Sequence, residues 1–336
     1  MSEDQSDIEL SVVVPCYNEQ GVLRELHRRL SGAIDPLAIG AQVIFINDGS
    51  RDGTWATMLE LASTDPRLVL VNLSRNHGHQ LALTAGLTQA TGRRVLIIDA
   101  DLQDPPELLP EMIRAMDSGV DVVYGVRRRR EGETWIKRAT AALFYRLIER
   151  VTDVPIPRDV GDFRLISRRA LDILLAMPER HRFIRGMVSW IGFRQVPLLY
   201  DRHPRFTGET KYPLRKMIQF ALDAITAFST KPLALASWAG VGTAVGSIAL
   251  LVYSLIAWLR GEVVVGWTSL MAAVTLLGSV QLLVMGVIGE YIGRMYEQVK
   301  GRPLFIIERI VRSTNQPTRL DGLAGEDPRA DARSNE

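Results

Sequence analysis

Two long uncharged stretches near the C-terminus constrain the fold of this chain more than any other sequence feature. They run from Leu233 to Leu259 and from Val263 to Gly289, and only the segment 260–262 separates them. Each is longer than the about 20 apolar residues that a helix needs to cross a bilayer. The pattern predicts a helical hairpin with a tight outer turn, and it argues against a purely soluble or a disordered chain.

The charges that flank the hairpin predict its orientation. Lys231 precedes the first stretch, and the segment Met1–Glu9 lacks the basic flank and apolar run of a signal peptide. Basic residues follow the second stretch, and these are Arg294, Lys300, Arg302, Arg309 and Arg312. The positive-inside rule places both ends of such a hairpin in the cytosol. We therefore expect a multi-pass protein of the inner (cytoplasmic) membrane, with both termini and the large N-terminal part in the cytosol.

Charge and cysteine content exclude several classes of protein. The formal net charge is +2, so no basic excess is available for phosphate backbones, and we expect no nucleic acid partner. Cys16 is the single cysteine, which rules out an internal disulfide and a zinc–cysteine cluster. We expect this thiol to be chemically inert.

Short apolar runs alternate with helical patterns over the first part of the chain. The runs are rich in Val and Ile, as expected of strands buried on both faces, and they are Leu10–Val14, Val43–Ile46, Leu68–Leu73, Val95–Ile98 and Val120–Tyr124. The helical segments are Glu19–Leu30, Thr54–Leu61, Gln80–Ala90 and Pro106–Met116. This alternation predicts an open, mostly parallel α/β sheet, whose functional residues lie at the carboxyl ends of the strands.

The remaining segments complete the predicted organisation. Segments 135–151 and 214–228 are amphipathic and basic. We place the second at the membrane interface, and we leave open whether the first packs on the sheet or lies on the membrane. The predicted parts are a cytosolic domain over 1–211, an interfacial helix over 212–230, the hairpin with a cytosolic C-terminal segment over 231–312, and a disordered tail over 313–336.

The strongest chemical signal is the carboxylate-rich segment Asp99–Asp104, directly after a predicted strand. Carboxylates that crowd a strand end are costly unless a cation or hydrogen-bond donors offset their charge. Oxygen ligands of this kind suit Mg²⁺ or Mn²⁺, which bind through one or two carboxylates together with substrate phosphates. A structural alternative is that Asp104 caps the helix that begins near Pro105. That alternative leaves Asp99 and Asp101 without an explanation.

Two further motifs end the first two predicted strands. They are Val12–Glu19 and Ile46–Gly53, and they place an aromatic ring, two acids and backbone amides at neighbouring strand ends. This combination suits a nucleobase and its ribose. Neither a GxGxxG nor a GxxxxGK[ST] loop occurs, so dinucleotide and P-loop binding lose their main support.

These motifs resemble those of family 2 glycosyltransferases, which have the nucleotide-sugar-binding GT-A fold. The matching residues are Pro15-x-Tyr17-Asn18-Glu19, Asn47-Asp48-Gly49-Ser50 and Asp99-Ala100-Asp101. A narrower resemblance is to polyprenyl-phosphate glycosyltransferases, which are related to dolichol-phosphate mannose synthase, and to their bactoprenol glucosyltransferase branch. It rests on Asp99–Glu107, Gly161–Arg164 and Gly289–Arg294. We therefore expect a Rossmann-like GT-A domain followed by a two-helix transmembrane hairpin.

The resemblance implies transfer of one sugar, with inversion, from a nucleotide diphosphate sugar to a polyprenyl phosphate such as undecaprenyl phosphate. The family branch favours UDP-glucose as donor, with N-acetylglucosamine, mannose or an aminoarabinose derivative as alternative sugars. A processive polysaccharide synthase fits less well, because the chain lacks a Gln-x-x-Arg-Trp motif. An inactive nucleotide-sugar-binding scaffold is also considered, although the intact Asp99 and Asp101 pair argues against it. Homo-oligomer formation is left open.

The same resemblance implies roles for individual residues in donor binding. The residues expected to hold the base and ribose are Pro15, Tyr17, Glu19 and Asp48. Asp101 and Gln103 are expected to reach the metal on the diphosphate, with Asp99 beside them. A divalent ion at this place would stabilise the charge that grows on the leaving diphosphate.

A second group of residues is implied near the phosphates and the acceptor. Arg127 and Arg138 match family arginines near the diphosphate and the acceptor phosphate, and Arg205 and Lys211 lie in a segment that resembles a mobile acceptor loop. Asp162 has two interpretations. It is a base or acceptor-positioning group, or it holds a nearby arginine and caps a turn.

Two histidines stand at the end of the third predicted strand, where His77 and His79 flank Gly78. Metal ligation and structural hydrogen bonding are both compatible with this position. We favour hydrogen bonding near the site.

Overall fold

The computed structural model describes residues 8–128, 160–201, 229, 231–260 and 266–312. The chain divides into two compact units. The first unit holds the described residues of 8–128, 160–201 and 302–312, and the second holds residue 229 and the described residues of 231–301.

An eight-stranded sheet forms the centre of the first unit, with its strands in the order β7-β5-β6-β4-β1-β2-β3-β8. Their bounds are β1 Leu10–Cys16, β2 Ala41–Asn47, β3 Leu68–Leu73, β4 Arg94–Ile97, β5 Val122–Arg127, β6 Val160–Ser167, β7 Gln195–Tyr200 and β8 Ile307–Arg312. Strands β3, β2, β1 and β4 are neighbours and run parallel, so their carboxyl ends meet at one edge of the sheet. Strand β6 is antiparallel to β4 on one side, and β8 is antiparallel to β3 on the other.

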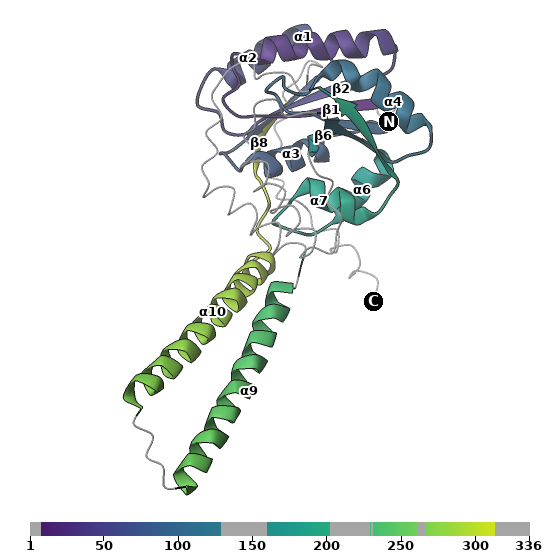
Figure 1. The fold of residues 1–336 in the computed structure, drawn as a ribbon. Coiled ribbons are helices and arrows are strands. Elements are labelled where there is room, and N and C mark those ends of the chain that lie inside the picture. Colours follow the sequence, from purple (N-terminus) through teal and green to yellow (C-terminus); the bar gives the residue numbers. More distant parts are fainter. Residues whose placement is uncertain (1–7, 129–159, 202–228, 230, 261–265, 313–336) are drawn as a thin grey trace, which may run out of the picture. The chain divides into compact units, whose positions relative to one another are not determined.

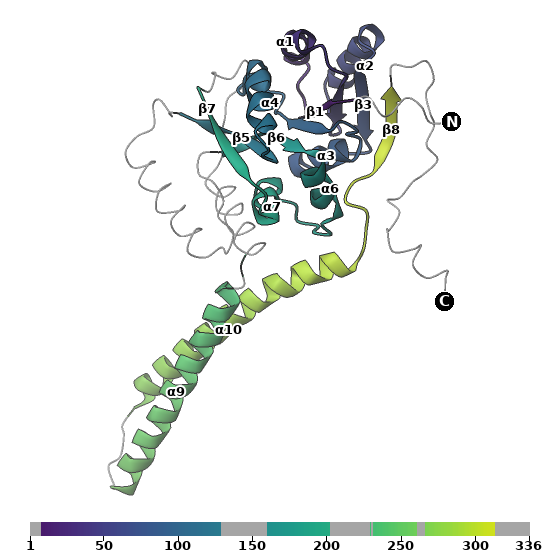
Figure 2. The ribbon, with the colours of Figure 1, turned by 90° about the vertical axis from the view of Figure 1, so that its right-hand side faces the viewer.

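Helices cover both faces of this sheet, as Figures 1 and 2 show. One face carries α1 (Leu23–Ile34), α2 (Thr54–Thr64) and α4 (Leu109–Asp117), and the other carries α3 (His79–Thr88), α6 (Arg168–Ala176) and α7 (Ile184–Ile191). Two short 3-10 helices, η1 (Asp35–Leu37) and η2 (Pro106–Leu108), precede β2 and α4. The predicted α/β class with a mostly parallel central sheet is confirmed.

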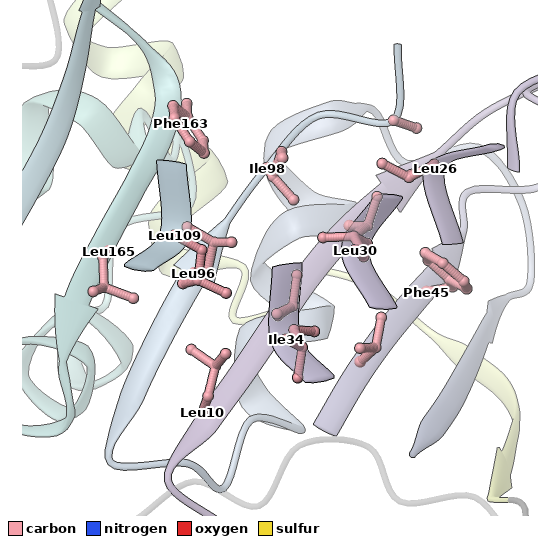
Figure 3. Packing of buried hydrophobic residues seen from close by; sticks show 14 of the residues in the cluster. Leu10, Leu26, Leu30, Ile34, Phe45, Leu96, Ile98, Leu109, Phe163 and Leu165 are labelled. Atoms are coloured by element: carbon pink, nitrogen blue, oxygen red, sulfur yellow. The ribbon is translucent and has the colours of Figure 1, made fainter. Parts of the chain in front are cut away.

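The core explains why the central strands read as continuous apolar runs. Leu26 and Leu30 of α1 pack on the sheet near Phe45, as Figure 3 shows. Val13 and Ile46 point to the opposite face, where their side chains approach Gly86 of α3. Because successive strand residues point to opposite faces and both faces are covered, almost every position must be apolar.

The five strands predicted from the sequence are all present, whereas β6, β7 and β8 were not predicted. The segment 231–312 was assigned to the hairpin and a cytosolic C-terminal segment, but Ile307–Arg312 is an edge strand of the sheet. Its sequence, Ile-Glu-Arg-Ile-Val-Arg, lacks the regular alternation of apolar and charged residues, and such a short edge strand gives a weak local signal.

The second unit contains two long helices, α9 (Lys231–Leu259) and α10 (Trp267–Val299), which lie side by side (Figure 1). Both are long and apolar enough to cross a membrane, and they expose large apolar side chains such as Leu251 and Leu282. Tyr291 Oη donates a 2.6 Å hydrogen bond to the carbonyl of Ser229. The predicted hairpin of apolar helices is confirmed.

The second helix differs from its predicted bounds at both ends. It begins at Trp267 rather than at Val263 and continues past Gly289 to Val299. Its added last turns mix charged residues with apolar ones such as Ile292 and Met295. Arg294 Nε lies 3.0 Å from Glu290 Oε1, and this i,i+4 spacing stabilises a helix. The predicted interfacial helix over 212–230 lies outside the described residues except for Ser229 and the tail over 313–336 lies wholly outside them.

Gly92, just before β4, lies in close contact with the backbone of β1. A Cβ atom there would lie 2.6 Å from the backbone nitrogen of Ser11 and 2.7 Å from the backbone carbon of Leu10. We expect Gly92→Ala to lower the free energy of unfolding by about 1–3 kcal/mol, measured by urea titration of the detergent-solubilised chain. The matched control is Gly32→Ala, because a Cβ at this exposed helix position meets nothing within 4 Å. Equal stability of the two variants would contradict this packing.

Candidate active site

The loops that follow β1, β2, β3 and β4 meet at the carboxyl edge of the parallel strands. This edge is where open α/β sheets carry their ligands. The loops after β1 and β2 are joined by reciprocal hydrogen bonds. The backbone N–H of Asn18 donates to Ser50 Oγ at 3.0 Å, and the backbone N–H of Arg51 donates to Asn18 Oδ1 at 2.8 Å. Asn18 has a left-handed backbone, with φ of 55°, which asparagine tolerates better than most residues.

A cavity of about 470 Å³ opens between these loops, and its lining includes Tyr17, Ser50, Arg51, Trp55 and Arg75. Tyr17 is 43% exposed, so its ring is available for stacking. The backbone N–H of Glu19 donates to Thr54 Oγ1 at 2.8 Å and so holds this loop against the start of α2. Aromatic rings beside guanidinium groups suit a base and its phosphates.

Pro15 and Asp48 are buried in this region rather than exposed to the cavity. Pro15 lies within β1 beside Ile46 of β2. Asp48 Oδ1 accepts the backbone N–H of His77 at 2.7 Å, and Asp48 Oδ2 accepts the backbone N–H of Gly78 at 2.9 Å. Burial raises the pKa of Asp48, and these two bonds oppose that rise. The carboxylate therefore ties the β3–α3 loop to the sheet, and its direct contact with a nucleotide stays a prediction.

The segment Asp99–Asp104 forms a turn whose shape depends on Leu102. This residue has a left-handed backbone, with φ of 58°, and its side chain is only 2% exposed. The backbone conformation costs about 1–2 kcal/mol, and burial of the leucine side chain contributes about 1.5–3 kcal/mol in return. The turn is closed by the backbone N–H of Gln103, which donates to Asp101 Oδ1 at 3.1 Å. The carboxyl groups of Asp99 and Asp101 stay partly exposed, whereas Gln103 is buried.

Asp162 lies beside Asp99 because β6 runs antiparallel to β4. Ile97 pairs with Arg164, and the same register continued by two residues brings Asp162 opposite Asp99. His79 joins the two carboxylates. Its Nε2 lies 3.4 Å from Asp99 Oδ1 and 3.2 Å from Asp162 Oδ2. Three segments distant in sequence thus converge on one point.

Asp162 is also held by further donors. Gln80 Nε2 donates to Asp162 Oδ2 at 2.9 Å, and Arg185 Nη2 lies 3.5 Å from Asp162 Oδ1. Arg164 is buried within β6, where its Nη2 donates to the carbonyl of Gly161 at 3.0 Å. Asp162 is therefore surrounded by positive charge and hydrogen-bond donors.

The pKa values of Asp99 and Asp162 shift in opposite directions. Burial raises the pKa of Asp99 to about 6. Burial also opposes ionisation of Asp162, but the hydrogen bond from His79 and the charges of Arg185 and Arg164 outweigh it and lower the pKa of Asp162. Burial alone would lower the pKa of His79, yet its bond to Asp162 and the charge of Asp99 raise that pKa to about 9. At neutral pH the imidazolium of His79 thus bridges the two acids.

The Asp104 side chain contacts residues of β5 and β7, and its role as a helix cap stays a prediction. The residue before η2 is Pro105, and no side-chain cap bond is made there. Asp104 is 1% exposed and accepts a hydrogen bond from Tyr200 Oη. Arg127 Nε donates to the same Oη at 3.3 Å, and Arg127 Nη2 lies 3.8 Å from Asp104 Oδ1. A buried carboxylate needs such donors, and they come from β5 and β7.

The residues at the β4 end fit a divalent cation that is shared with a diphosphate. Oδ1 of Asp99 is buried, and apart from the 3.4 Å ionic contact with His79 Nε2 it accepts no hydrogen bond within the described part of the chain. The described residues contain no group of three or more His, Cys, Asp and Glu side chains arranged to hold a metal by themselves. Mg²⁺ and Mn²⁺ need only one or two carboxylates when phosphates and water complete their shell. Asp99 and Asp101 supply oxygen donors of the right chemistry.

Comparison with known proteins identifies the family. Residues 11–175 match the model of glycosyl transferase family 2, and residues 231–295 match the GtrB C-terminal hairpin. The uncharacterized glycosyltransferase YkcC of Bacillus subtilis is 46% identical over 90% of this chain and 94% of its own length. A prophage bactoprenol glucosyl transferase homolog of Escherichia coli is 38% identical over 90% of this chain and 99% of its own length. The bactoprenol glucosyl transferase of Shigella phage SfII is 38% identical over 90% of this chain and 98% of its own length.

This chain belongs to glycosyltransferase family 2. The glycosyltransferase has the GT-A fold predicted from its motifs, and its C-terminal hairpin of apolar helices associates it with a membrane. Of the predicted site residues, the structure brings Asp99 and Asp162 together and places Asp101 in the same loop as Asp99. Arg138, Arg205 and Lys211 lie outside the described residues.

Several polar residues of the glycosyltransferase site were not foreseen. The preference for hydrogen bonding by His79 agrees with its contact to Asp162, but its bridge to Asp99 was not predicted. Gln80, Arg185 and Tyr200 had no local signal, because each sits in an ordinary helix or strand pattern. Only the pairing of β4 with β6 and the packing of α3 and α7 beside them reveal these residues as part of the site.

Proposed function

We propose that this glycosyltransferase transfers a single glucose from UDP-glucose to polyprenyl phosphate, such as undecaprenyl phosphate, with inversion. The product is a lipid-linked sugar for glycosylation of the cell envelope. The observation that carries the proposal is that one chain combines the partly exposed carboxyl groups of Asp99 and Asp101 at the sheet edge with a pair of apolar helices. Relatives that match nine-tenths of the chain are named bactoprenol glucosyl transferases, which supports the sugar and the lipid.

The donor is assigned to the cavity and the β4 end. Tyr17 would stack on the base, with Glu19 near the ribose and Pro15 and Asp48 shaping the loops behind them. Asp99 and Asp101, and Gln103 if its buried amide turns outward, would hold Mg²⁺ or Mn²⁺ on the diphosphate. When bound, this cation would stabilise the negative charge that develops on the departing UDP. Arg127 and Arg138 would add positive charge near the phosphates.

The acceptor phosphate needs little activation by a base. Its second pKa is about 6, so it is largely ionised at neutral pH. Asp162 has a lowered pKa and accepts from several donors, which makes it a weak base. We assign it the positioning role, in which it orients His79 and Arg185 beside the reacting groups. Arg205 and Lys211 would bind the acceptor phosphate.

The proposed topology places the catalytic domain and both chain ends in the cytosol, with the hairpin crossing the inner membrane twice. Lys231 before α9 and the basic residues after the apolar part of α10 support this orientation. Protease added to sealed inside-out vesicles should digest both the N-terminal domain and the tail beyond Ser313, whereas sealed right-side-out vesicles should protect them. Protection of either part in inside-out vesicles would contradict the topology.

Turnover assays with the full chain in nanodiscs test the proposed function. UDP release from UDP-glucose should require both undecaprenyl phosphate and a divalent metal, and EDTA should abolish it. UDP-N-acetylglucosamine, GDP-mannose and a UDP-aminoarabinose derivative serve as competing donors. If one of these donors gives faster lipid-dependent turnover than UDP-glucose, then its sugar, and not glucose, is the one transferred. Nucleotide-sugar binding without turnover of any donor would indicate a scaffold instead of an enzyme.

A further inference from the structure

Strand β8, which follows the second apolar helix in sequence, carries an irregularity beside the donor cavity. It pairs with β3 at the edge of the sheet, as Figure 2 shows. Asn72 pairs with Arg309 and Leu73 pairs with Ile307, so Glu308 is an extra residue between two successive pairs. Such a bulge turns a side chain away from its regular direction, and bulges are common next to active sites.

The bulged residue starts a chain of side-chain hydrogen bonds across three neighbouring strands. Asn72 Nδ2 donates to Glu308 Oε2 at 2.8 Å, and Asn47 Nδ2 donates to Asn72 Oδ1 at 2.6 Å. Asn47 Oδ1 then accepts the backbone N–H of Ser50 at 3.2 Å. Asn47 is only 4% exposed, so its amide depends on protein partners for these bonds.

Glu308, at the outer end of this series of hydrogen bonds, decides which group donates and which accepts in each bond. A carboxylate can only accept hydrogen bonds, so Glu308 requires Asn72 to present its NH₂ group. The oxygen of Asn72 is thereby directed to the NH₂ group of Asn47, and the oxygen of Asn47 is directed to the backbone of Ser50. A donor-only side chain at position 308 would reverse this order and leave two donors facing each other.

The inner end of this series of hydrogen bonds is the 47–53 loop, which lines the cavity that we assign to the donor. Ser50 Oγ accepts the backbone N–H of Asn18, which follows Tyr17. Glu308 itself lines the same cavity as Tyr17 and Arg75. The strand after the hairpin thus contributes one wall of the cavity and the outermost hydrogen bond of its loop.

We propose that Glu308 is a positioning residue of the donor site, which fixes the conformation of the 47–53 loop through the side chains of Asn72 and Asn47. The proposal rests on the assignment of this cavity to the nucleotide under the proposed function. Glu308 acts through other residues and takes no part in the chemical step. Its loss therefore weakens donor binding and leaves kcat nearly unchanged.

Hydrogen–deuterium exchange of the full chain in nanodiscs tests the hydrogen-bond chain without any ligand. In Glu308→Lys, the amides of 47–53 should exchange at least about tenfold faster, since a backbone N–H that loses its partner opens more readily. Glu308→Gln retains an acceptor oxygen and should stay within about twofold of the wild type. Arg309→Ala is the matched control, because Arg309 is the neighbouring exposed residue of β8. Unchanged exchange in Glu308→Lys, or equal acceleration in Arg309→Ala, would overturn the proposal.

UDP binding measured by calorimetry on the same samples tests the link to the donor. The Kd for UDP should rise about tenfold in Glu308→Lys, which corresponds to about 1.4 kcal/mol, and about twofold or less in Glu308→Gln. Faster exchange with an unchanged Kd would overturn the positioning role. If the wild type does not bind UDP, the proposed donor is wrong, and the exchange experiment alone then decides whether Glu308 orders the loop.

Discussion

Replacing Asp101 by alanine should lower sugar transfer by more than about a hundredfold, the scale of losing one strong charge-stabilising contact in a transition state. Asp101 is partly exposed in the turn after β4, where its Oδ1 accepts a hydrogen bond from the nearby backbone N–H of Gln103. Its loss should therefore cost little stability. The measurement is lipid-dependent UDP release at saturating Mg²⁺, compared with the unfolding midpoint of the same preparation.

The matched control for Asp101→Ala is Asp117→Ala. Asp117 is an exposed carboxylate at the end of α4, 2.6 Å from Arg94, and it lies outside the candidate site. This variant should keep nearly full transfer. Near-normal turnover of Asp101→Ala at saturating Mg²⁺ would remove Asp101 from the proposed metal site.

Replacing Asp162 by asparagine should lower kcat by about a hundredfold while the KM for the donor changes by less than about threefold. Asparagine keeps the shape but removes the charge that His79 and Arg185 face. Without that charge the two cations repel each other and leave their positions beside Asp99. Steady-state kinetics with UDP-glucose and undecaprenyl phosphate separate the two parameters.

A loss of buried charge elsewhere provides the control for Asp162→Asn. Asp121 is 3% exposed, accepts a 2.8 Å hydrogen bond from Ser167 Oγ and pairs with Arg169. Asp121→Asn should reduce stability through the lost ion pair but leave kcat per folded molecule unchanged. If both variants lower kcat equally, the effect of Asp162 is one of stability. If Asp162→Asn raises mainly the donor KM, the residue belongs to the donor site.

The parallel strands of the sheet could be predicted because each is marked by its own apolar residues and by the polar motif that follows it. Runs such as Val43–Ile46 are apolar at every position, and the polar motifs follow them directly. The carboxyl-edge rule then places Tyr17, Asp48 and Asp101 at one edge without any knowledge of long-range contacts. The rule does not reveal which of these side chains already form hydrogen bonds within the protein. Asp48 does so, because it accepts from the backbone N–H groups of His77 and Gly78.

The antiparallel strands were not predicted because the contacts that stabilise them involve residues far away in the sequence. Strand β6 contains Asp162 and Arg164, charges that interrupt an apolar run. Their burial makes sense only beside His79, 83 residues upstream of Asp162. The bond from Tyr200 to Asp104 escaped prediction for the same reason, since Tyr200 is 96 residues downstream. The buried polar residues of β6 are therefore a signal of the site itself, rather than evidence against a strand.

Mass spectrometry of the lipid product tests the central claim most directly. Nanodiscs that contain the full chain and undecaprenyl phosphate are incubated with UDP-glucose and Mg²⁺, and the lipids are extracted. We predict undecaprenyl phosphate that carries one hexose, formed by the wild type and absent in Asp101→Ala. A lipid with several hexoses, or UDP release without any glycosylated lipid, would contradict transfer of a single sugar to a polyprenyl phosphate.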